Sequence, residues 1–157
     1  MKFKYGFLLI LCVLFSRISI AQDGSDEQIK RSILNFFEGF HERDSVAIKK
    51  TISDHFILRT IFLDSSGSEV LKTTPVNTFL FSLTKIPQNK TFEEKLLSFS
   101  IHTDGLMAHA WTPYEFWYDG SLSHCGVNSF RLMKTKTGWH IISITDTRYK
   151  NQCEKQE

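Results

Sequence analysis

The last third of the chain, residues 104–149, consists of aromatic and β-branched runs separated by turn signals. Asp104-Gly105 and Asp119-Gly120 are two such signals, and residues 135–138 form a looser third. An Asp-Gly pair between apolar runs is typical of a tight hairpin, because a type I′ turn needs positive φ at both central residues. The pattern predicts an antiparallel meander with strands near 91–103, 106–118, 121–134 and 139–149.

The first half of the chain has a helical period. After a capping box at residues 25–28, apolar residues recur on one helix face. Asp44 can cap a second, short helix, and Thr74-Pro75 can begin a third. The expected helices lie near 26–42, 45–53 and 75–86, with a strand hairpin at 55–63 and 68–73 before the third. The positions of the first apolar face are Ile29, Ile33, Phe36, Phe37 and Phe40. This order predicts an α+β domain with helices on one face of an antiparallel sheet.

Two stretches resemble a known group of proteins. Residues 36–44 (FFEGFHERD) and 138–146 (GWHIISITD), together with the element order, resemble the nuclear transport factor 2-like, or SnoaL-like, group over residues 26 to about 149. The resemblance implies a cone, in which a curved antiparallel sheet wraps around about three helices and encloses a pocket. That group includes isomerases, dehydratases, hydrolases and proteins with no known reaction, so the resemblance implies a fold more than a reaction.

The N-terminus has the pattern of a secretory signal peptide. Two lysines precede an apolar run at 7–15 that is too short to cross a bilayer, and small residues follow it. We expect cleavage between Ala21 and Gln22. Residues 1–21 would then be the leader, and residues 22–157 one exported domain, periplasmic or secreted, with a short C-terminal tail.

Loss of the leader changes the charge of the chain. The net charge of the whole sequence is +2, but the leader holds three of the 19 Lys and Arg and none of the 17 Asp and Glu, which leaves 16 against 17 and a net charge of −1. This balance offers no basic surface for nucleic acid or for an anionic membrane. We expect neither as a partner after cleavage.

Two cysteines, Cys125 and Cys153, lie outside the leader. In an oxidising compartment such a pair is typical of one disulfide. The alternative is two unpaired thiols, with Cys125 buried and Cys153 on a mobile tail.

A candidate pocket follows from the strand register. Counting back from the Asp119-Gly120 turn places Glu115 opposite His124 and Trp111 opposite Asn128, and opposed residues share a sheet face. That face combines aromatic residues with convergent polar groups, as ligand pockets do, so we assign it to the cone interior. The other face is nearly all apolar and suits a homodimer contact through the sheet, or the core itself.

The candidate ligand-binding residues are polar or aromatic side chains of the meander: His109, Trp111, Tyr114, Glu115, His124 and Asn128. Tyr114 is the alternative to Glu115, because Pro113 cannot donate to a ladder and a bulge there would slip the register by one residue. Asp146 and Arg148 lie two apart on the last strand, share a face and could form an ion pair at the pocket rim.

The pairing of Glu115 with His124 is the strongest candidate for chemistry. A carboxylate can orient an imidazole and raise its pKa for acid–base catalysis, whereas an exposed pair would contribute only a few tenths of a kcal/mol. No motif of the group's enzymes matches, so catalytic residues stay unassigned. Metal-ligand spacings, phosphate loops, nucleophile elbows and CxxC are absent, so we expect no metal and no cofactor.

Two functions remain. The first is an exported cone domain that binds a small apolar ligand, with lyase- or isomerase-like activity as one form. The second is a non-catalytic dimeric interaction module whose cone is filled by its own side chains. Several hundred Å³ of open space near His124 and Asn128 would favour the first.

Overall fold

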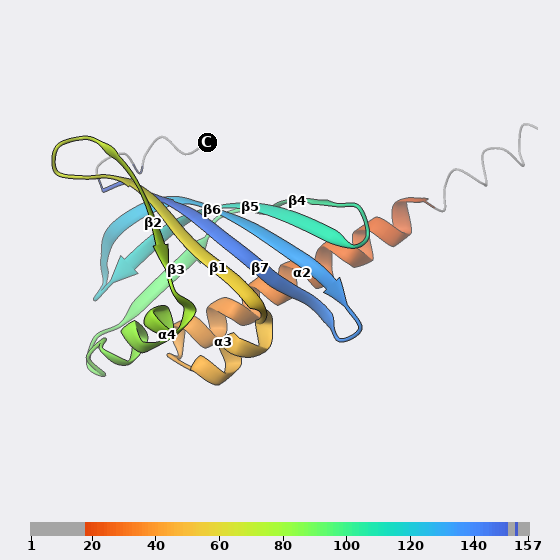
Figure 1. Ribbon diagram of the computed structural model, residues 1–157, viewed down its shortest axis with the longest axis horizontal. Coiled ribbons are helices and arrows are strands. Elements are labelled where there is room, and N and C mark those ends of the chain that lie inside the picture. Colours follow the sequence, from red (N-terminus) through yellow and green to blue (C-terminus); the bar gives the residue numbers. More distant parts are fainter. Residues whose placement is uncertain (1–17, 151–152, 154–157) are drawn as a thin grey trace, which may run out of the picture.

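The computed structural model describes residues 18–150 and residue 153. A curved, seven-stranded sheet wraps over the helices and forms the cone that the sequence resemblance implied (Figure 1). The strand order is β2-β1-β7-β6-β5-β3, with β4 also paired to β5. The elements are α2 (Ile18–His41), α3 (Ser45–Thr51), β1 (Ile52–Leu63), β2 (Glu69–Thr74), α4 (Val76–Thr84), β3 (Phe92–Leu96), β4 (Ser100–Thr103), β5 (Met107–Tyr118), β6 (Ser121–Thr135) and β7 (Gly138–Arg148).

The sheet is mixed, which corrects the expectation of a wholly antiparallel one. β1 runs parallel to β7, and all other neighbouring strands are antiparallel. The reason lies in the connection: α3 leads directly into β1, and Ile52 at the start of β1 pairs with Ile141 near the start of β7. The apolar pattern of a strand does not encode its direction, so the sequence carried no signal for this pairing.

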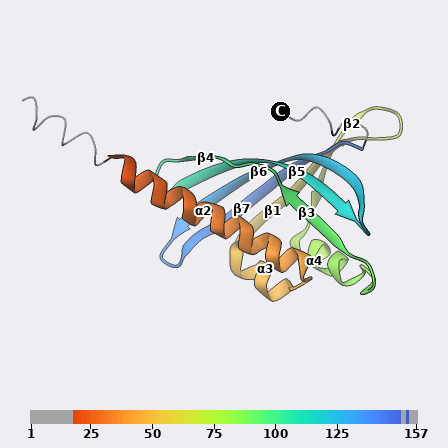
Figure 2. The same ribbon diagram turned by 180° about the vertical axis from the view of Figure 1, so that it is seen from behind.

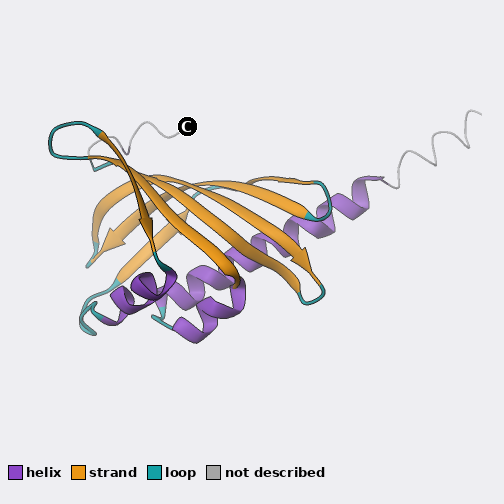
Figure 3. Cartoon of the chain, in the orientation of Figure 1, coloured by secondary structure: helices purple, strands orange, loops and turns teal. Residues whose placement is uncertain are grey.

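α2 lies across the concave side of the sheet, with α3 and α4 near one end (Figures 2 and 3). Its predicted apolar face is confirmed, since Ile29, Ile33, Phe36 and Phe37 are all buried. The Ser32 hydroxyl donates to the Trp139 carbonyl of β7 at 2.8 Å, which ties the helix to the sheet. Each fully buried Ile or Phe contributes roughly 1.5–3 kcal/mol, so this face holds the cone together.

α2 begins at Ile18, eight residues before the predicted start at 26. The capping box at 25–28 therefore lies inside the helix, because the preceding residues continue it and supply the carbonyls that the box would otherwise replace. Most of the expected leader, residues 1–17, lies outside the described residues. Within the described part, no helix has the length and apolar character needed to cross a membrane.

The other helix starts are close to those predicted. Asp44 caps α3, and its Oδ1 accepts hydrogen bonds from the Val46 and Ala47 amides at 2.8 and 3.0 Å. Pro75 precedes the first residue of α4. Side-chain capping thus determines where α3 begins, whereas Pro75 is the N-cap of α4 without a side-chain hydrogen bond, so this helix begins one residue later than predicted.

The strand expected at 91–103 is broken into β3 and β4. Leu96 pairs with Tyr114 and Ser100 with Trp111, which leaves three residues on one strand opposite two on β5. Pro113 lies at this point of β5, and its carbonyl accepts from the Leu97 amide at 2.9 Å. Because proline has no N–H group to donate to the neighbouring strand, the hydrogen-bond ladder of β5 with β3 and β4 is interrupted there.

Cys125 and Cys153 form a disulfide, with their Cα atoms 5.5 Å apart. The alternative of two unpaired thiols is therefore wrong. Cys125 also exchanges two backbone hydrogen bonds with Tyr149, at 3.0 and 2.8 Å. Together these bonds fasten the segment after β7 to β6. A disulfide of this kind persists in oxidising compartments.

Candidate functional site

The register between β5 and β6 decides which side chains enter the cone. The Asp119-Gly120 turn has positive φ at both residues and pairs Tyr118 with Ser121, as predicted. Ser123 is then an extra residue on β6, so that Phe116 pairs with His124. The predicted pairing of Glu115 with His124 is wrong, because this bulge shifts every later pair by one.

The shift separates the six predicted ligand-binding residues into two groups. Tyr114, His124 and Asn128 lie on the concave side, and Asn128 pairs with Thr112 rather than with Trp111. The alternative in which Tyr114 replaces Glu115 inside the cone is thus confirmed. The shift comes from Ser123, although Pro113 was the expected cause.

His109, Trp111 and Glu115 lie on the convex side. Trp111 is 47 % exposed, His109 Nε2 lies 3.1 Å from the Ser129 hydroxyl, and Glu115 accepts from the Trp117 indole at 2.9 Å. The expectation that His109 and Trp111 share a cavity with His124 is therefore corrected. Residues of even and odd number on one strand face opposite sides of the sheet. The bulge on β6 therefore reversed which of the two sets on β5 faces the interior of the cone.

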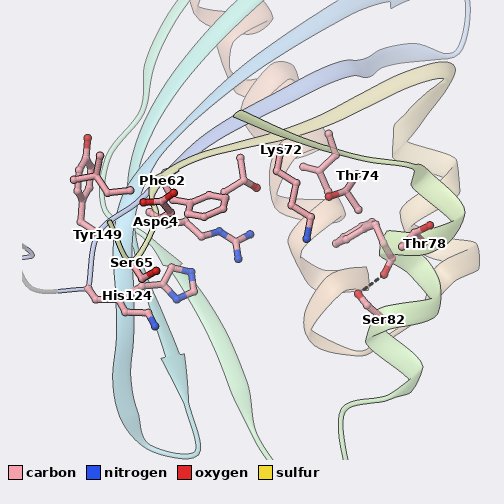
Figure 4. Close-up of a pocket in the computed structure, with 15 residues that line it drawn as sticks. Phe62, Asp64, Ser65, Lys72, Thr74, Thr78, Ser82, His124 and Tyr149 are labelled. Carbon is pink, nitrogen blue, oxygen red and sulfur yellow. Dashed lines mark hydrogen bonds between the residues drawn. The ribbon is translucent and has the colours of Figure 1, made fainter. Parts of the chain in front are cut away.

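A cleft of about 890 Å³ opens on the concave side, between the β1–β2 hairpin, α4 and the ends of β6 and β7 (Figure 4). His124 lines it, whereas Asn128 does not. The apolar lining residues are Leu58, Phe62, Leu63, Phe79 and Tyr149. The polar and charged ones are Thr60, Asp64, Ser65, Lys72, Thr74, Thr78, Ser82, His124, Arg148 and Lys150. Apolar walls with a few polar groups are typical of small-molecule sites.

Asp146 organises the polar side of the cleft. Its carboxylate accepts from the Thr60 hydroxyl at 2.7 Å and from Arg148 Nε at 2.8 Å, and the ion pair predicted between Asp146 and Arg148 is confirmed. Asp146 is only 4 % exposed. A buried carboxylate needs such partners, because an unpaired charge in the interior is costly. The result is an arginine and a threonine held in place at the cleft wall.

Tyr114 packs behind this group. Its hydroxyl donates to the Thr147 carbonyl at 2.9 Å and lies 3.4 Å from Asp146. Burial and the nearby Asp146 raise the pKa of Tyr114 far above its ordinary value, so it stays a donor. Gly126 makes this contact possible, because a Cβ at that position would clash with the Thr147 carbonyl group.

Glu94 is half-buried and lies outside this cleft, at a second hollow between α2 and β3. Its carboxylate accepts from the Asn128 side-chain amide at 2.7 Å. Burial, reinforced by Asp146, raises the pKa of Glu94 to about 7, although the hydrogen bond from Asn128 opposes this shift. Asn128 thus has a structural partner.

His124 reaches the cleft with its ring stacked on Phe116, at 4.7 Å between ring centroids. Burial lowers the pKa of His124 to about 4, and Arg148 and Lys150 lower it further while Asp146 acts in the opposite direction. Ser123 lies 3.2 Å from Nδ1, and among the described residues Nε2 has no hydrogen-bond partner. At neutral pH the ring is therefore uncharged and can offer Nε2 to a ligand.

Several residues of the site were absent from the predicted set. Thr60 and Lys72 come from the first hairpin and reach the cleft through the parallel pairing of β1 with β7, which the sequence pattern did not indicate. Gly126 carried a usable signal, since a glycine inside a strand often marks close approach of another backbone. Among the described residues, no three His, Cys, Asp or Glu side chains gather as metal ligands would.

Comparisons with known proteins agree with the geometry at the level of fold. No protein-family model and no curated protein matches the sequence. An NTF2-like protein with a cystatin-like fold from Novosphingobium aromaticivorans is 11% identical, over 88% of this chain and 90% of its own, with a TM-score of 0.62. An NTF2-like protein of unknown function from Shewanella baltica is 14% identical, over 78% and 92%, with a TM-score of 0.55.

A proposed dehydratase from the NTF2-like family of Streptomyces avermitilis is also 14% identical, over 82% of this chain and 98% of its own, with a TM-score of 0.58. At such identities the likeness concerns the arrangement of helices and strands and carries no information about chemistry. The resemblance seen in the sequence is confirmed in the same sense: the chain has the nuclear transport factor 2-like, or cystatin-like, fold.

Proposed function

We propose that the protein binds a small molecule in the cleft beside His124. The observation that carries this proposal is the open space of about 890 Å³, which lies within the usual range of ligand sites and joins apolar walls to a polar side. The alternative of a cone filled by its own side chains would leave no such space.

Binding fits the site better than acid–base catalysis does. A lyase or isomerase needs a group that takes up a proton near neutral pH, and catalytic bases have pKa values near the working pH. His124 is the histidine of the cleft, and with a pKa of about 4 it is a weak base. The raised pKa of Glu94 would suit a base, but this carboxylate is bound to Asn128 away from the cleft lining. A lyase- or isomerase-like activity is therefore the second form of the proposal.

The test is to fill the cleft from a position where the fold tolerates a large residue. Thr78 on α4 is exposed and lines the cleft, whereas its neighbour Asn77 is exposed and does not. Native mass spectrometry of the protein from its own host should detect a bound small molecule. Thr78→Trp should lose this molecule and Asn77→Trp should keep it. Retention by both variants would place the ligand elsewhere, and a ligand-free wild type that also binds nothing in a metabolite extract would contradict the proposal.

We also propose that the protein acts after export, as residues 22–157. The leader-like pattern of residues 1–21 and the Cys125–Cys153 disulfide support this. N-terminal sequencing of protein from the periplasmic or extracellular fraction should begin at Gln22. An intact Met1 product in the cytoplasm, with both thiols reduced, would overturn this proposal.

A further inference from the structure

We propose that the ligand of the cleft is an amphipathic organic anion, whose oxyanion binds Arg148 and Lys72 and whose apolar body lies against Phe62 and Phe79. This inference rests on the proposed function and specifies its ligand class.

The cleft has an excess of positive charge. Its lining holds three cationic side chains, Lys72, Arg148 and Lys150, against one carboxylate, Asp64. That carboxylate is engaged within its own turn, where Oδ1 accepts from the Ser66 amide and hydroxyl and from the Ser68 amide. Of the three cations, Arg148 is paired with Asp146, whereas among the described residues Lys72 and Lys150 have no carboxylate partner within 4.0 Å.

The guanidinium of Arg148 is oriented by Asp146 and has free N–H donors for an oxyanion. Its Nε donates to Asp146, and in the described part of the chain neither terminal nitrogen of the guanidinium donates to a protein atom. Asp146 is buried and is itself held by Thr60, while the Arg148 side chain is half-exposed. Arginine offers paired N–H donors that match a carboxylate, sulfonate or phosphate, and a fixed arginine loses little freedom on binding one.

Lys72 approaches from the opposite wall. In Figure 4 its side chain extends from β2 toward α4, where the hydroxyl-bearing residues Thr78 and Ser82 lie. Among the described residues, Lys72 has no carboxylate partner within 4.0 Å. The Ser82 hydroxyl already donates to the Phe79 carbonyl at 2.6 Å. The free ammonium group of Lys72 can add a second point of attraction for an anion, and its flexible stem can adapt to the ligand.

His124 lies among the same charged groups of the cleft. The groups that face its ring are Arg148 and Asp146 of β7, Lys150 after β7, and the Tyr114 and Phe116 rings of β5. Burial is the main cause of the lowered pKa of His124; Arg148 and Lys150 lower it further and Asp146 opposes them. A neutral imidazole can still offer a hydrogen bond without repelling an anion or adding to the charge.

The apolar part of the ligand follows from the remaining walls. Leu58, Phe62 and Phe79 line the same cleft and offer no charged group. A small inorganic anion would leave these walls in contact with water, whereas an anion with an aromatic or aliphatic body would cover them. The cleft therefore favours an organic anion over free phosphate or sulfate.

The experiment uses two fluorescent probes that share one aromatic body. The anionic probe is 8-anilinonaphthalene-1-sulfonate, and the neutral one is N-phenyl-1-naphthylamine, which lacks the sulfonate. Titration of the disulfide-bonded protein should show a saturable site for the anion, with affinity at least tenfold higher than for the neutral probe at low salt. Added salt should weaken only the anionic probe, because it screens charge.

Variants locate the charge. Lys72→Met should weaken the sulfonate probe about fivefold or more and leave the neutral probe unchanged, as loss of an exposed charge contact predicts. Lys136→Met, in the exposed β6–β7 turn, is the matched control and should change neither probe. Arg148→Gln should weaken the sulfonate probe further, and Arg148→Lys should restore part of the affinity. Because Arg148 supports Asp146, near-UV circular dichroism must show that both arginine variants keep their tertiary packing.

An anion bound here should also raise the pKa of His124, which NMR titration with and without the sulfonate probe measures. Equal or tighter binding of the neutral probe, with no effect of Lys72→Met, would overturn the anion inference and leave small-molecule binding in place. Failure of both probes to bind the wild type would overturn the inference, while the mass-spectrometry experiment on the wild type decides the proposed function separately. Free phosphate competing as well as the sulfonate would overturn the assignment to an organic anion.

Discussion

Asp146 is the residue on which the polar side of the cone depends. It joins Thr60 of β1 to Arg148 of β7, and the Tyr114 hydroxyl lies at its edge. A carboxylate in this position does two things at once: it satisfies buried donors, and it fixes the direction of a guanidinium that lines the cleft.

Asp146→Ala should lower the free energy of unfolding by about 2–3 kcal/mol, because it leaves the buried Thr60 hydroxyl without an acceptor and removes the ion pair. Urea denaturation at neutral pH measures this change. Asp54→Ala, at an exposed carboxylate of β1, is the control and should stay within about 0.5 kcal/mol of the wild type. Equal stability of both variants would show that the Asp146 contacts contribute nothing.

Glu94 should make the protein less stable as the pH rises. Its pKa is near 4.5 in the unfolded chain and about 7 in the fold. Between these values the unfolded chain has lost the proton that the folded chain keeps, so the stabilisation present below pH 4.5 is lost as the pH rises to 7. Glu94→Gln cannot ionise and keeps an oxygen for Asn128. Its stability relative to the wild type should therefore increase from pH 4.5 to 8 by on the order of 2 kcal/mol.

The readout for Glu94 is the difference between variant and wild type, measured by urea denaturation at several pH values. The whole curve also contains His124, whose pKa of about 4 makes stability rise with pH over the range from 4 to 6.5. Glu69→Gln, at an exposed position of β2, is the control. A Glu94→Gln difference that is the same at all pH values would contradict a raised pKa.

The positions of individual side chains in the site were predicted less well than the fold. The turn at Asp119-Gly120 was readable because only particular residues adopt positive φ there. The bulge at Ser123 was not readable, since serine is ordinary in a strand and the local pattern tolerates either register. One such residue moved Glu115 out of the cone and Tyr114 into it, which is why half of the predicted site lies on the convex side.

At the scale of helices and strands, local signals were enough for most boundaries. Asp44 caps α3 as predicted, and Pro75 marks the start of α4 to within one residue. The parallel pairing of β1 with β7 depends on tertiary structure, because the position of α3 sets the direction in which the chain enters the sheet. Local patterns carry no information about that direction, so Thr60 and Lys72 could not be assigned to the site from the sequence.

Among the contacts between secondary-structure elements, we expect the Cys125–Cys153 disulfide to contribute most to the free energy of unfolding. It closes a loop between positions 28 residues apart and holds Tyr149 and Lys150, which line the cleft, close to β6. Cys153→Ser should lower the free energy of unfolding by about 3–4 kcal/mol, the entropy that the loop removes from the unfolded chain. Cys153 is half-buried whereas Cys125 is fully buried, so changing Cys153 places no new hydroxyl in the interior beside β6.

Urea denaturation with and without a thiol reductant checks this prediction. Reduction should bring the wild type to the stability of Cys153→Ser and leave the variant unchanged. It should also weaken binding of the sulfonate probe, because Lys150 is no longer held at the cleft. A wild type that is equally stable oxidised and reduced would mean that the loop is already constrained by the Cys125–Tyr149 backbone bonds.

The whole molecule has two unlike surfaces. The helices lie on the concave side of the sheet, and none of the described helices covers its convex side (Figures 1 and 2). Met107, Trp111 and Met133, which we call the convex patch, are all strongly exposed, and Met107 pairs directly with Met133. An exposed apolar group on a sheet face is typical of a protein contact, and a second copy of the chain offers the same surface.

We expect the protein to form a homodimer through the convex patch, with Trp111 near its centre. Tryptophan residues in such positions often contribute 2 kcal/mol or more, and Trp111→Glu would place two carboxylates in a symmetric contact. The dissociation constant of the dimer should therefore rise by roughly a hundredfold or more, with little change in the stability of the monomer. Sedimentation velocity at micromolar concentrations measures both species.

Val46→Glu, at an exposed apolar position of α3 on the helical side, is the matched control and should leave the dimer intact. A monomeric wild type, or a dimer that Trp111→Glu does not weaken, would contradict the prediction. The convex patch would then have to serve a different partner.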